Sequence, residues 1–187
     1  GHSPDGRRCG QRDPCRGVPL CPPKTTSGFF VKSGDDLTYM NMALDLAARG
    51  RGLTTPNPMV GAVVVKRGQI VGNGYHRRAG GAHAEIEALA RAGKDAKGAT
   101  LYVTLEPCCH LGLTGPCTET IIDAGIARVV YADKDPDPRV NGRGARVLKT
   151  AGVRVTSGVC AQEARQLNEV HYHFHRTGRP LVVVKFA

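Results

Sequence analysis

Four side chains of types that bind metals or transfer protons stand at short, defined spacings in the middle of this sequence. His83 and Glu85 lie two positions apart, Cys108 follows a Glu-Pro pair, and Cys117 lies nine positions further on. One imidazole and two thiolates are ligands that zinc accepts, and three protein ligands leave a fourth tetrahedral position for water, as in catalytic zinc sites. We therefore predict that His83, Cys108 and Cys117 bind a zinc ion.

Glu85 is the side chain that would move protons at such a site. Two successive steps on an ideal helix point about 200° apart, so Glu85 is a poor fourth ligand beside His83, yet at a distorted first turn both can face one cavity. Zinc acidifies water, and a neighbouring carboxylate can take the proton, pass it to a ring nitrogen and protonate a leaving amine. The pattern predicts Glu85 as the catalytic acid and base of a hydrolytic deamination.

The surrounding sequence predicts alternating helices and strands that would position these residues. A first helix is expected to begin at Asp35 or Asp36, with Leu37 and Met40 on its apolar face, and to end near Gly50. Two β-rich runs follow, and the Arg-Gly pair between them is typical of a tight hairpin. The strands are predicted at 60–66, 69–75, 99–105, 127–132 and 153–156, and the later helices at 83–93, 116–125, 144–151 and 161–176.

This order of elements predicts the fold class α/β, as a three-layer α/β/α sandwich around a mixed, mostly five-stranded sheet. The folded domain is expected to span 35–176. Residues 1–34 are rich in Pro, Gly, Arg and Ser without periodicity, so we interpret them as a disordered basic extension. Residues 177–187 are interpreted as a linker and the first strand of an absent second domain, or else as an edge strand of this one.

Composition narrows the class of protein. Of the 187 residues, 41% are hydrophobic and 22% charged, and no apolar run approaches the length of a transmembrane helix, so a membrane role is not expected. The formal net charge is +10, and twenty basic against fourteen acidic residues remain beyond position 34. Such a surplus attracts an anionic metabolite or a nucleic acid and does not distinguish between them.

The seven cysteines do not indicate a disulfide framework, because their number is odd and no secretory signal opens the chain. Cys108 and Cys117 fit metal ligation in a reducing, cytoplasmic setting better than bridging. Cys109 is interpreted as a packed neighbour and Cys160 as an ordinary buried thiol. The three cysteines within the first 34 residues lack His partners, so a metal or redox role for them is not favoured.

Longer motifs surround both groups of predicted ligands and extend to the later loops. They lie at 55–63, 76–85, 103–108, 115–117, 135–136 and 142–144, with 176–178 and Lys185 near the end. Through them, residues 36–180 resemble the deaminase domain of the bifunctional deaminase/reductase of riboflavin biosynthesis, in the cytidine deaminase-like superfamily. The run at 176–178 and Lys185 resemble the approach to the reductase domain of that family.

The resemblance implies zinc-dependent hydrolysis of the 2-amino group of 2,5-diamino-6-(5-phosphoribosylamino)pyrimidin-4-one, giving the corresponding uracil and ammonia. It also implies that Asn57 and His76 contact the pyrimidine and its surroundings, and that His110 and Asp135 lie nearer the ribose phosphate. The implied partners are this small phosphorylated pyrimidine, further copies of the chain in a homo-oligomer, and a reductase domain that is fused or associated in the native protein.

Three positions depart from the family's pattern. Leu113 stands where Lys or Arg is common, Gly115 where Pro is common, and Asp137 where Asn is common. Two of these changes make the phosphate-binding end less cationic. A carboxylate at 137 is expected to weaken phosphate binding unless it points away or meets a cation such as Arg139 or Arg143.

Two other functions stay open on the residues alone. One is a deaminase of another pyrimidine, or of tRNA or single-stranded DNA, which would use the same metal chemistry. Only 5% of the residues are aromatic and none is Trp, so platforms for stacking bases are scarce and nucleic acid is the less favoured substrate. The other is a non-catalytic, zinc-stabilised module, in which Glu85 would have no task.

Several polar residues also have plain structural interpretations. Asn57, between two prolines, fits a turn residue, and His76 fits a surface loop residue. His171, His173 and His175 alternate along a predicted helix, so only the first and last share a face. We interpret them as part of a solvated helix rather than as a second active centre.

Overall fold

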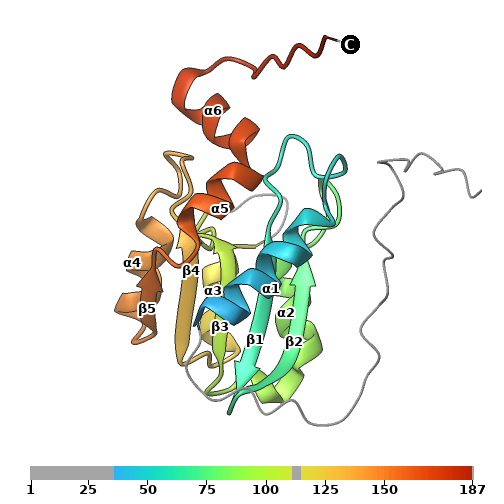
Figure 1. Cartoon of the computed structure of the whole chain (residues 1–187). Coiled ribbons are helices and arrows are strands. Elements are labelled where there is room, and N and C mark those ends of the chain that lie inside the picture. The colour runs from blue at the N-terminus through green and yellow to red at the C-terminus, as the bar shows by residue number, and fades with distance from the viewer. Residues whose placement is uncertain (1–35, 111–114, 187) are drawn as a thin grey trace, which may run out of the picture.

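A computed structural model describes residues 36–110 and 115–186, and its centre is a five-stranded sheet in the order β2-β1-β3-β4-β5 (Figure 1). β1 pairs antiparallel with β2 and β3, whereas β3, β4 and β5 run parallel. The predicted mixed sheet is therefore confirmed. The strands are β1 Gly61–Lys66, β2 Gln69–Tyr75, β3 Thr100–Leu105, β4 Arg128–Asp133 and β5 Arg154–Ser157.

Helices cover both faces of the sheet, which confirms the three-layer α/β/α sandwich. One core lies between the sheet and the helices α2 Ala84–Ala92, α3 Cys117–Asp123 and α4 Arg143–Thr150. A second core lies under α1 Asp36–Ala48 and α5 Ala161–Leu167, which cross in front of the strands in Figure 1. A short 3-10 helix, η1 Gly93–Ala96, precedes β3, and α6 Glu169–Thr177 lies beyond the carboxyl ends of the parallel strands.

The central strands are apolar almost throughout because each of their faces meets a layer of helices. On β1, Ala62 and Val64 face the core beside α2, and Val63 and Val65 face the core beneath α1. Successive side chains of a strand point to opposite faces, so a strand buried on both sides needs apolar residues at every position. The continuous apolar run at 99–105 has the same cause.

Two glycines of β2 set the distance between the sheet and α2. A Cβ atom added at Gly72 would lie 2.2 Å from the carbonyl oxygen of Ala88, and one at Gly74 would lie 2.6 Å from the Cβ of Glu87. These contacts are too close for any side chain, so glycine lets the helix lie directly on the strand. The first turn of α2, which follows His83, is positioned by this packing.

The predicted helix over 161–176 is wrong in one respect, because it is broken at Asn168. The side chain of Asn168 is buried and pairs with the backbone of Met59: its Oδ1 accepts a 2.7 Å hydrogen bond from the amide, and its Nδ2 donates a 2.8 Å bond to the carbonyl oxygen. α5 ends just before it and α6 begins just after it. A contact between positions 109 apart leaves no signature in a local periodicity.

Smaller differences concern residues at the surface. Leu37 is 55% exposed, whereas Tyr39 is buried with its ring centroid 5.1 Å from that of Tyr102. Cys160 is half-buried rather than buried and precedes α5 in a left-handed conformation. The described residues 181–186 form no strand. The predictions for 1–34 and for Leu113 lie outside the described residues.

Within the described part of the chain, none of the helices has both the length and the apolar character needed to cross a bilayer.

Candidate metal centre and active site

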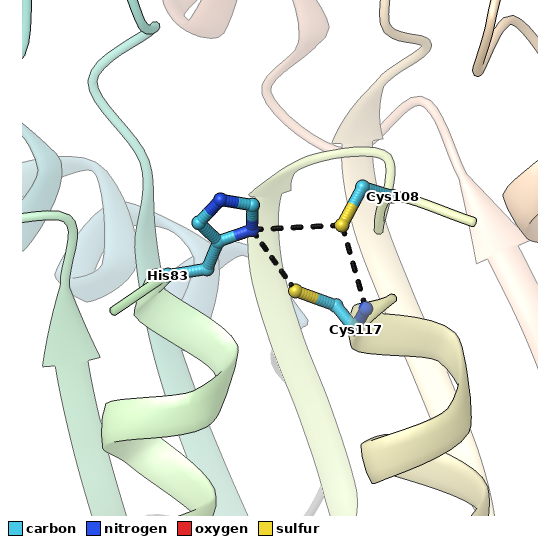
Figure 2. A group of neighbouring side chains, drawn as sticks. All are labelled: His83, Cys108 and Cys117. Carbon is cyan, nitrogen blue, oxygen red and sulfur yellow. Dashed lines mark hydrogen bonds between the residues drawn. The ribbon is translucent and has the colours of Figure 1, made fainter. Parts of the chain in front are cut away.

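The predicted ligands come together where two helices begin and one strand ends. His83 directly precedes α2, Cys117 is the first residue of α3, and Cys108 lies three residues beyond the end of β3. Figure 2 shows the three side chains pointing toward one another from these elements. The three residues are 34 positions apart at most, and the sheet and the two helices packed on it bring them to one point.

The geometry of this group fits a tetrahedral metal ion. The Nδ1 atom of His83 lies 3.1 Å from Sγ of Cys117 and 3.5 Å from Sγ of Cys108. All three ligand atoms lie within 4.8 Å of one another. A nitrogen and a sulfur bound to one tetrahedral zinc ion are separated by about 3.6 Å. The side chains are therefore arranged for a zinc ion, with Nδ1 as the imidazole nitrogen that faces it.

Hydrogen bonds within the group favour a thiolate at Cys108. Its pKa is lowered to about 4, first by the hydrogen bond with the Cys117 thiol and further by His83 and by the amide of Cys117, which lies 3.4 Å from Sγ. The same sulfur contact raises the pKa of Cys117, and burial adds to this rise. The hydrogen bond to Cys108 raises the pKa of His83. A cation bound between the sulfurs favours the thiolate form of both.

Glu85 faces the same group from the first turn of α2. Its side chain is buried and accepts a hydrogen bond from the Cys117 thiol. Burial raises the pKa of Glu85 to about 7, the negative charge of Cys108 adds to this, and His83 opposes it. A carboxyl group that titrates near neutral pH can both accept and return a proton. These contacts agree with the prediction that His83 and Glu85 face one cavity at the start of this helix.

Glu106, which precedes Pro107 and Cys108 in the motif, has a structural task that sequence reasoning missed. Its Oε2 accepts a 2.8 Å bond from the amide of Gly142, and its Oε1 accepts a 2.9 Å bond from the amide of Ala145. These are amides at the start of α4, where a carboxylate is stabilised by the unpaired N–H groups. Glu106 thus ties the loop after β4 to the segment that carries Cys108.

Gly144 allows this close contact. A Cβ atom at this position would lie 2.0 Å from the carbonyl oxygen of Pro107, so no larger residue fits between α4 and the segment after β3. The glycine-rich stretch at 142–144 was singled out in the sequence as part of a motif. Its close packing on Pro107 gives a physical reason for one of these glycines.

Asn57 and His76 lie next to the metal ligands and contact each other. Nδ2 of Asn57 donates to Nε2 of His76 over 3.2 Å, and Nδ1 of His76 donates to the carbonyl oxygen of Ala82 over 3.0 Å. Together these bonds fit the neutral tautomer with its proton on Nδ1. His76 is buried, with its ring centroid 5.6 Å from that of His83, so the interpretation as a surface loop residue is wrong. Asn57 is exposed.

His110 and Asp135 follow the carboxyl ends of two neighbouring strands. β3 and β4 are in register through Leu105 and Asp133, so the segments that carry His110 and Asp135 leave the sheet side by side. His110 is half-buried, and its Nδ1 has no hydrogen-bond partner among the described residues. Asp135 is buried. The structure therefore places both at the edge of the sheet that carries the metal ligands.

Two of the three departures from the family's pattern, Asp137 and Gly115, lie among the described residues and are accommodated locally. Asp137 accepts three hydrogen bonds of 2.6 to 3.1 Å from the guanidinium group of Arg139 and a fourth from its amide. These contacts hold the pKa of Asp137 at about 2. The negative charge of Asp137 is therefore paired with Arg139, one of the two cations that the sequence suggested for it. Gly115 has open space around its Cα.

The histidines of α6 are not all solvated, which corrects the sequence interpretation. Nε2 of His171 lies 3.1 Å from Oδ1 of Asp135, and both side chains are only about one-tenth exposed. His175 shares the face of His171, as predicted, with its ring centroid 4.5 Å away. The long-range partner of His171 explains why spacing on the helix alone did not predict this contact.

Fold and site together define a class of protein. In zinc-dependent nucleobase deaminases, a His and two Cys residues bind the metal, and a Glu two positions from the His is not a ligand but transfers protons. This chain has the same set in His83, Glu85, Cys108 and Cys117. Its second cysteine follows the first by nine positions, whereas the common spacing is three.

Comparison with known proteins identifies the family. Residues 33–133 match the model of the cytidine and deoxycytidylate deaminase zinc-binding region, and this match covers more than half of the chain. The chain belongs to this zinc-dependent deaminase family. The match and the His/Cys/Cys group confirm the prediction of zinc as the cofactor.

Relatives of higher similarity are proteins of riboflavin biosynthesis. The chain is 55% identical over 152 residues to riboflavin biosynthesis protein RibD of Aquifex aeolicus, covering 81% of this chain and 43% of that protein. The RibD structure of Acinetobacter baumannii matches with a TM-score of 0.76 and 48% identity, over 78% of this chain and 41% of that one.

A structure from Thermotoga maritima matches with a TM-score of 0.74 and 44% identity, over 78% of this chain and 42% of that one. That protein is called a diaminohydroxyphosphoribosylaminopyrimidine deaminase/5-amino-6-(5-phosphoribosylamino)uracil reductase. The chain spans less than half the length of each of these three relatives.

Proposed function

We propose that this chain hydrolyses the 2-amino group of 2,5-diamino-6-(5-phosphoribosylamino)pyrimidin-4-one, giving the corresponding uracil and ammonia. The observation that carries the proposal is the buried Glu85 carboxyl beside the group of His83, Cys108 and Cys117. The choice of substrate is supported by the 55% identity to a riboflavin biosynthesis protein and by the deaminase activity in the name of the Thermotoga maritima relative.

In this proposal His83 through Nδ1, and Cys108 and Cys117 through their sulfurs, are the metal ligands. Zinc, when bound there, supplies Lewis acidity that makes water a nucleophile near neutral pH. Glu85 removes the proton from the attacking water and delivers protons to the pyrimidine ring and to the amino nitrogen. The carbon–nitrogen bond then breaks, ammonia leaves, and the ring keeps the oxygen of the water as its new carbonyl group.

Four residues are proposed to bind the substrate around this centre. Asn57 and His76 contact the pyrimidine, and their mutual hydrogen bond fixes the His76 imidazole beside His83. His110 and Asp135 face the ribose phosphate from the ends of β3 and β4.

The setting of the reaction follows from the same proposal. Free thiols at Cys108 and Cys117 are maintained in reducing compartments, which supports a cytoplasmic location. The bifunctional name of the Thermotoga maritima relative supports a reductase domain, fused or associated, as the consumer of the product. A homo-oligomer remains a prediction from family resemblance.

The test is ammonia release from the diaminopyrimidine ribose phosphate by zinc-loaded protein, measured in parallel with the dephosphorylated compound. Rapid release that requires the phosphate and is lost in Glu85→Gln is the expected result. Release from neither compound by protein that holds zinc would contradict the proposed substrate and point to other pyrimidines or to nucleic acid. Equal release by wild type and Glu85→Gln would contradict the proposed chemistry.

A further inference from the structure

The loop after β4 carries two buried carboxylates, and α6 lies against both. Asp135 and Asp137 are 9% and 6% exposed. His171 contacts the first directly, over 3.1 Å, and His175 is close enough to the second to lower its pKa through its charge. A helix of this chain thus supplies basic side chains to a loop that we place at the ribose phosphate of the substrate.

The two oxygens of Asp135 are used differently. Oδ1 accepts a 2.9 Å bond from the amide of Asp137 and the 3.1 Å bond from Nε2–H of His171. Among the described residues, none makes a hydrogen bond to Oδ2. The carboxylate is therefore held by two hydrogen bonds to one oxygen, and no described residue uses the other.

α6 is itself held firmly at both substrate segments. Asn168, just before its first residue, is bonded to the backbone of Met59, two positions after Asn57. The hydroxyl of Tyr172 donates to the carbonyl oxygen of Lys134, which directly precedes Asp135. The helix thus connects the segment of Asn57 to the loop of Asp135, and the imidazole of His171 approaches that loop from a fixed direction.

We propose that His171 is a positioning residue for substrate binding: its hydrogen bond to Oδ1 holds the Asp135 carboxylate so that Oδ2 faces the hydroxyl groups of the substrate's ribose. Since a carboxylate only accepts hydrogen bonds, a sugar hydroxyl is the group of a ribose phosphate that it can bind, whereas the phosphate would be repelled. His171 does not touch the substrate or the metal ligands. This inference rests on the function proposed above.

The test compares His171→Leu, His171→Gln and His173→Leu in steady-state deamination of the diaminopyrimidine ribose phosphate. Glutamine can place an amide N–H close to the position of Nε2, so it serves as the conservative variant. His173→Leu is the matched control, because it makes the same change on α6 and the His173 ring makes no hydrogen bond, ion pair or aromatic contact with a described residue. Loss of one positioning hydrogen bond should raise KM about five- to tenfold in His171→Leu while kcat stays within about twofold.

His171→Gln should recover a KM within about twofold of wild type, and His173→Leu should not differ from it. A wild-type KM in His171→Leu, or a KM that glutamine does not restore, would overturn the positioning role. A large fall in kcat with KM unchanged would also overturn it, because that pattern belongs to a group acting in the chemical step.

A second measurement separates this inference from the proposed function. Nitrogen NMR of the imidazole in the zinc-loaded protein should show His171 with a protected Nε2–H that is lost in Asp135→Ala. If wild type releases no ammonia from this substrate, the proposed function fails, whether or not the Nε2–H signal is present. If wild type is active and the signal is absent or unaffected by Asp135→Ala, only the role of His171 fails.

Discussion

The metal centre and the outer rim of the site are built in different ways. The centre consists of side chains at the first turns of α2 and α3 and just after β3, and its contacts are made by a nitrogen, two sulfurs and a buried carboxyl. The rim consists of the loop after β4 and α6, which are joined by polar contacts such as that between Asp135 and His171. We expect the centre to carry out the reaction and the rim to orient the substrate.

This difference predicts two kinds of response to mutation. A residue of the centre has a role that no neighbour can take over, because the reaction needs a proton carrier at one place. The rim is held together by several hydrogen bonds. Mutating one of its residues removes only part of them, so binding or stability should change by moderate amounts. Mutations in the centre and in the rim can therefore test whether their effects differ in this way.

The largest effect is expected for Glu85→Gln. The amide cannot carry a proton, so turnover should fall at least about 10²-fold, while the fold and the bound zinc are retained because glutamine has nearly the same shape. Activity and zinc content of the same preparation measure both quantities. Glu87→Gln is the matched control: it lies on the same helix, pairs with Arg77 at the surface, and should keep its activity. Loss of zinc from Glu85→Gln would show that the carboxyl helps to hold the metal.

A smaller effect, on stability rather than chemistry, is expected for Asn168→Ala at the start of α6. The mutation leaves the amide and the carbonyl oxygen of Met59 without their partner, in a place where Asn168 is only 3% exposed. Losing two such hydrogen bonds should lower the free energy of unfolding by about 2–4 kcal/mol. Denaturant unfolding measures this, and the exposed Asn141→Ala, which loses no side-chain hydrogen bond to a described residue, should differ little from wild type. Equal stabilities of the two variants would contradict the view that the hydrogen bonds between Asn168 and Met59 hold α6 in place.

The same contrast separates what the sequence could predict from what it could not. His83, Glu85, Cys108 and Cys117 stand in short motifs, and the alternation of helices and strands fixes where those motifs must lie. The break at Asn168 and the bond between His171 and Asp135 depend on partners 109 and 36 positions away. Such contacts follow from the folded arrangement and leave no periodic trace. The task of Glu106 at the start of α4 was missed for the same reason.

The smallest effect is expected at Asp137, whose partner Arg139 is largely exposed to solvent. Its pKa is about 2 in the folded protein, against an ordinary value of 3.8, chiefly because Arg139 donates hydrogen bonds to it. A carboxylate with a lowered pKa stabilises the fold above its unfolded pKa, and this contribution is lost as the pH falls through the folded pKa. Asp137→Asn should therefore be less stable than wild type at pH 7, and the difference should shrink below about pH 4.

Unfolding free energies of both proteins between pH 3 and pH 7 test this sign, with Asp45→Asn on the exposed side of α1 as the control. The loss at pH 7 is expected to stay below that of Asn168→Ala, because the Arg139 side chain is 70% exposed and its ion pair is screened by water. If the stability difference between wild type and Asp137→Asn instead grew toward low pH, the charged carboxylate would destabilise the folded loop. In that case Arg139 would not compensate for the negative charge at position 137. The loop after β4 would then be held in place by its contacts with α6.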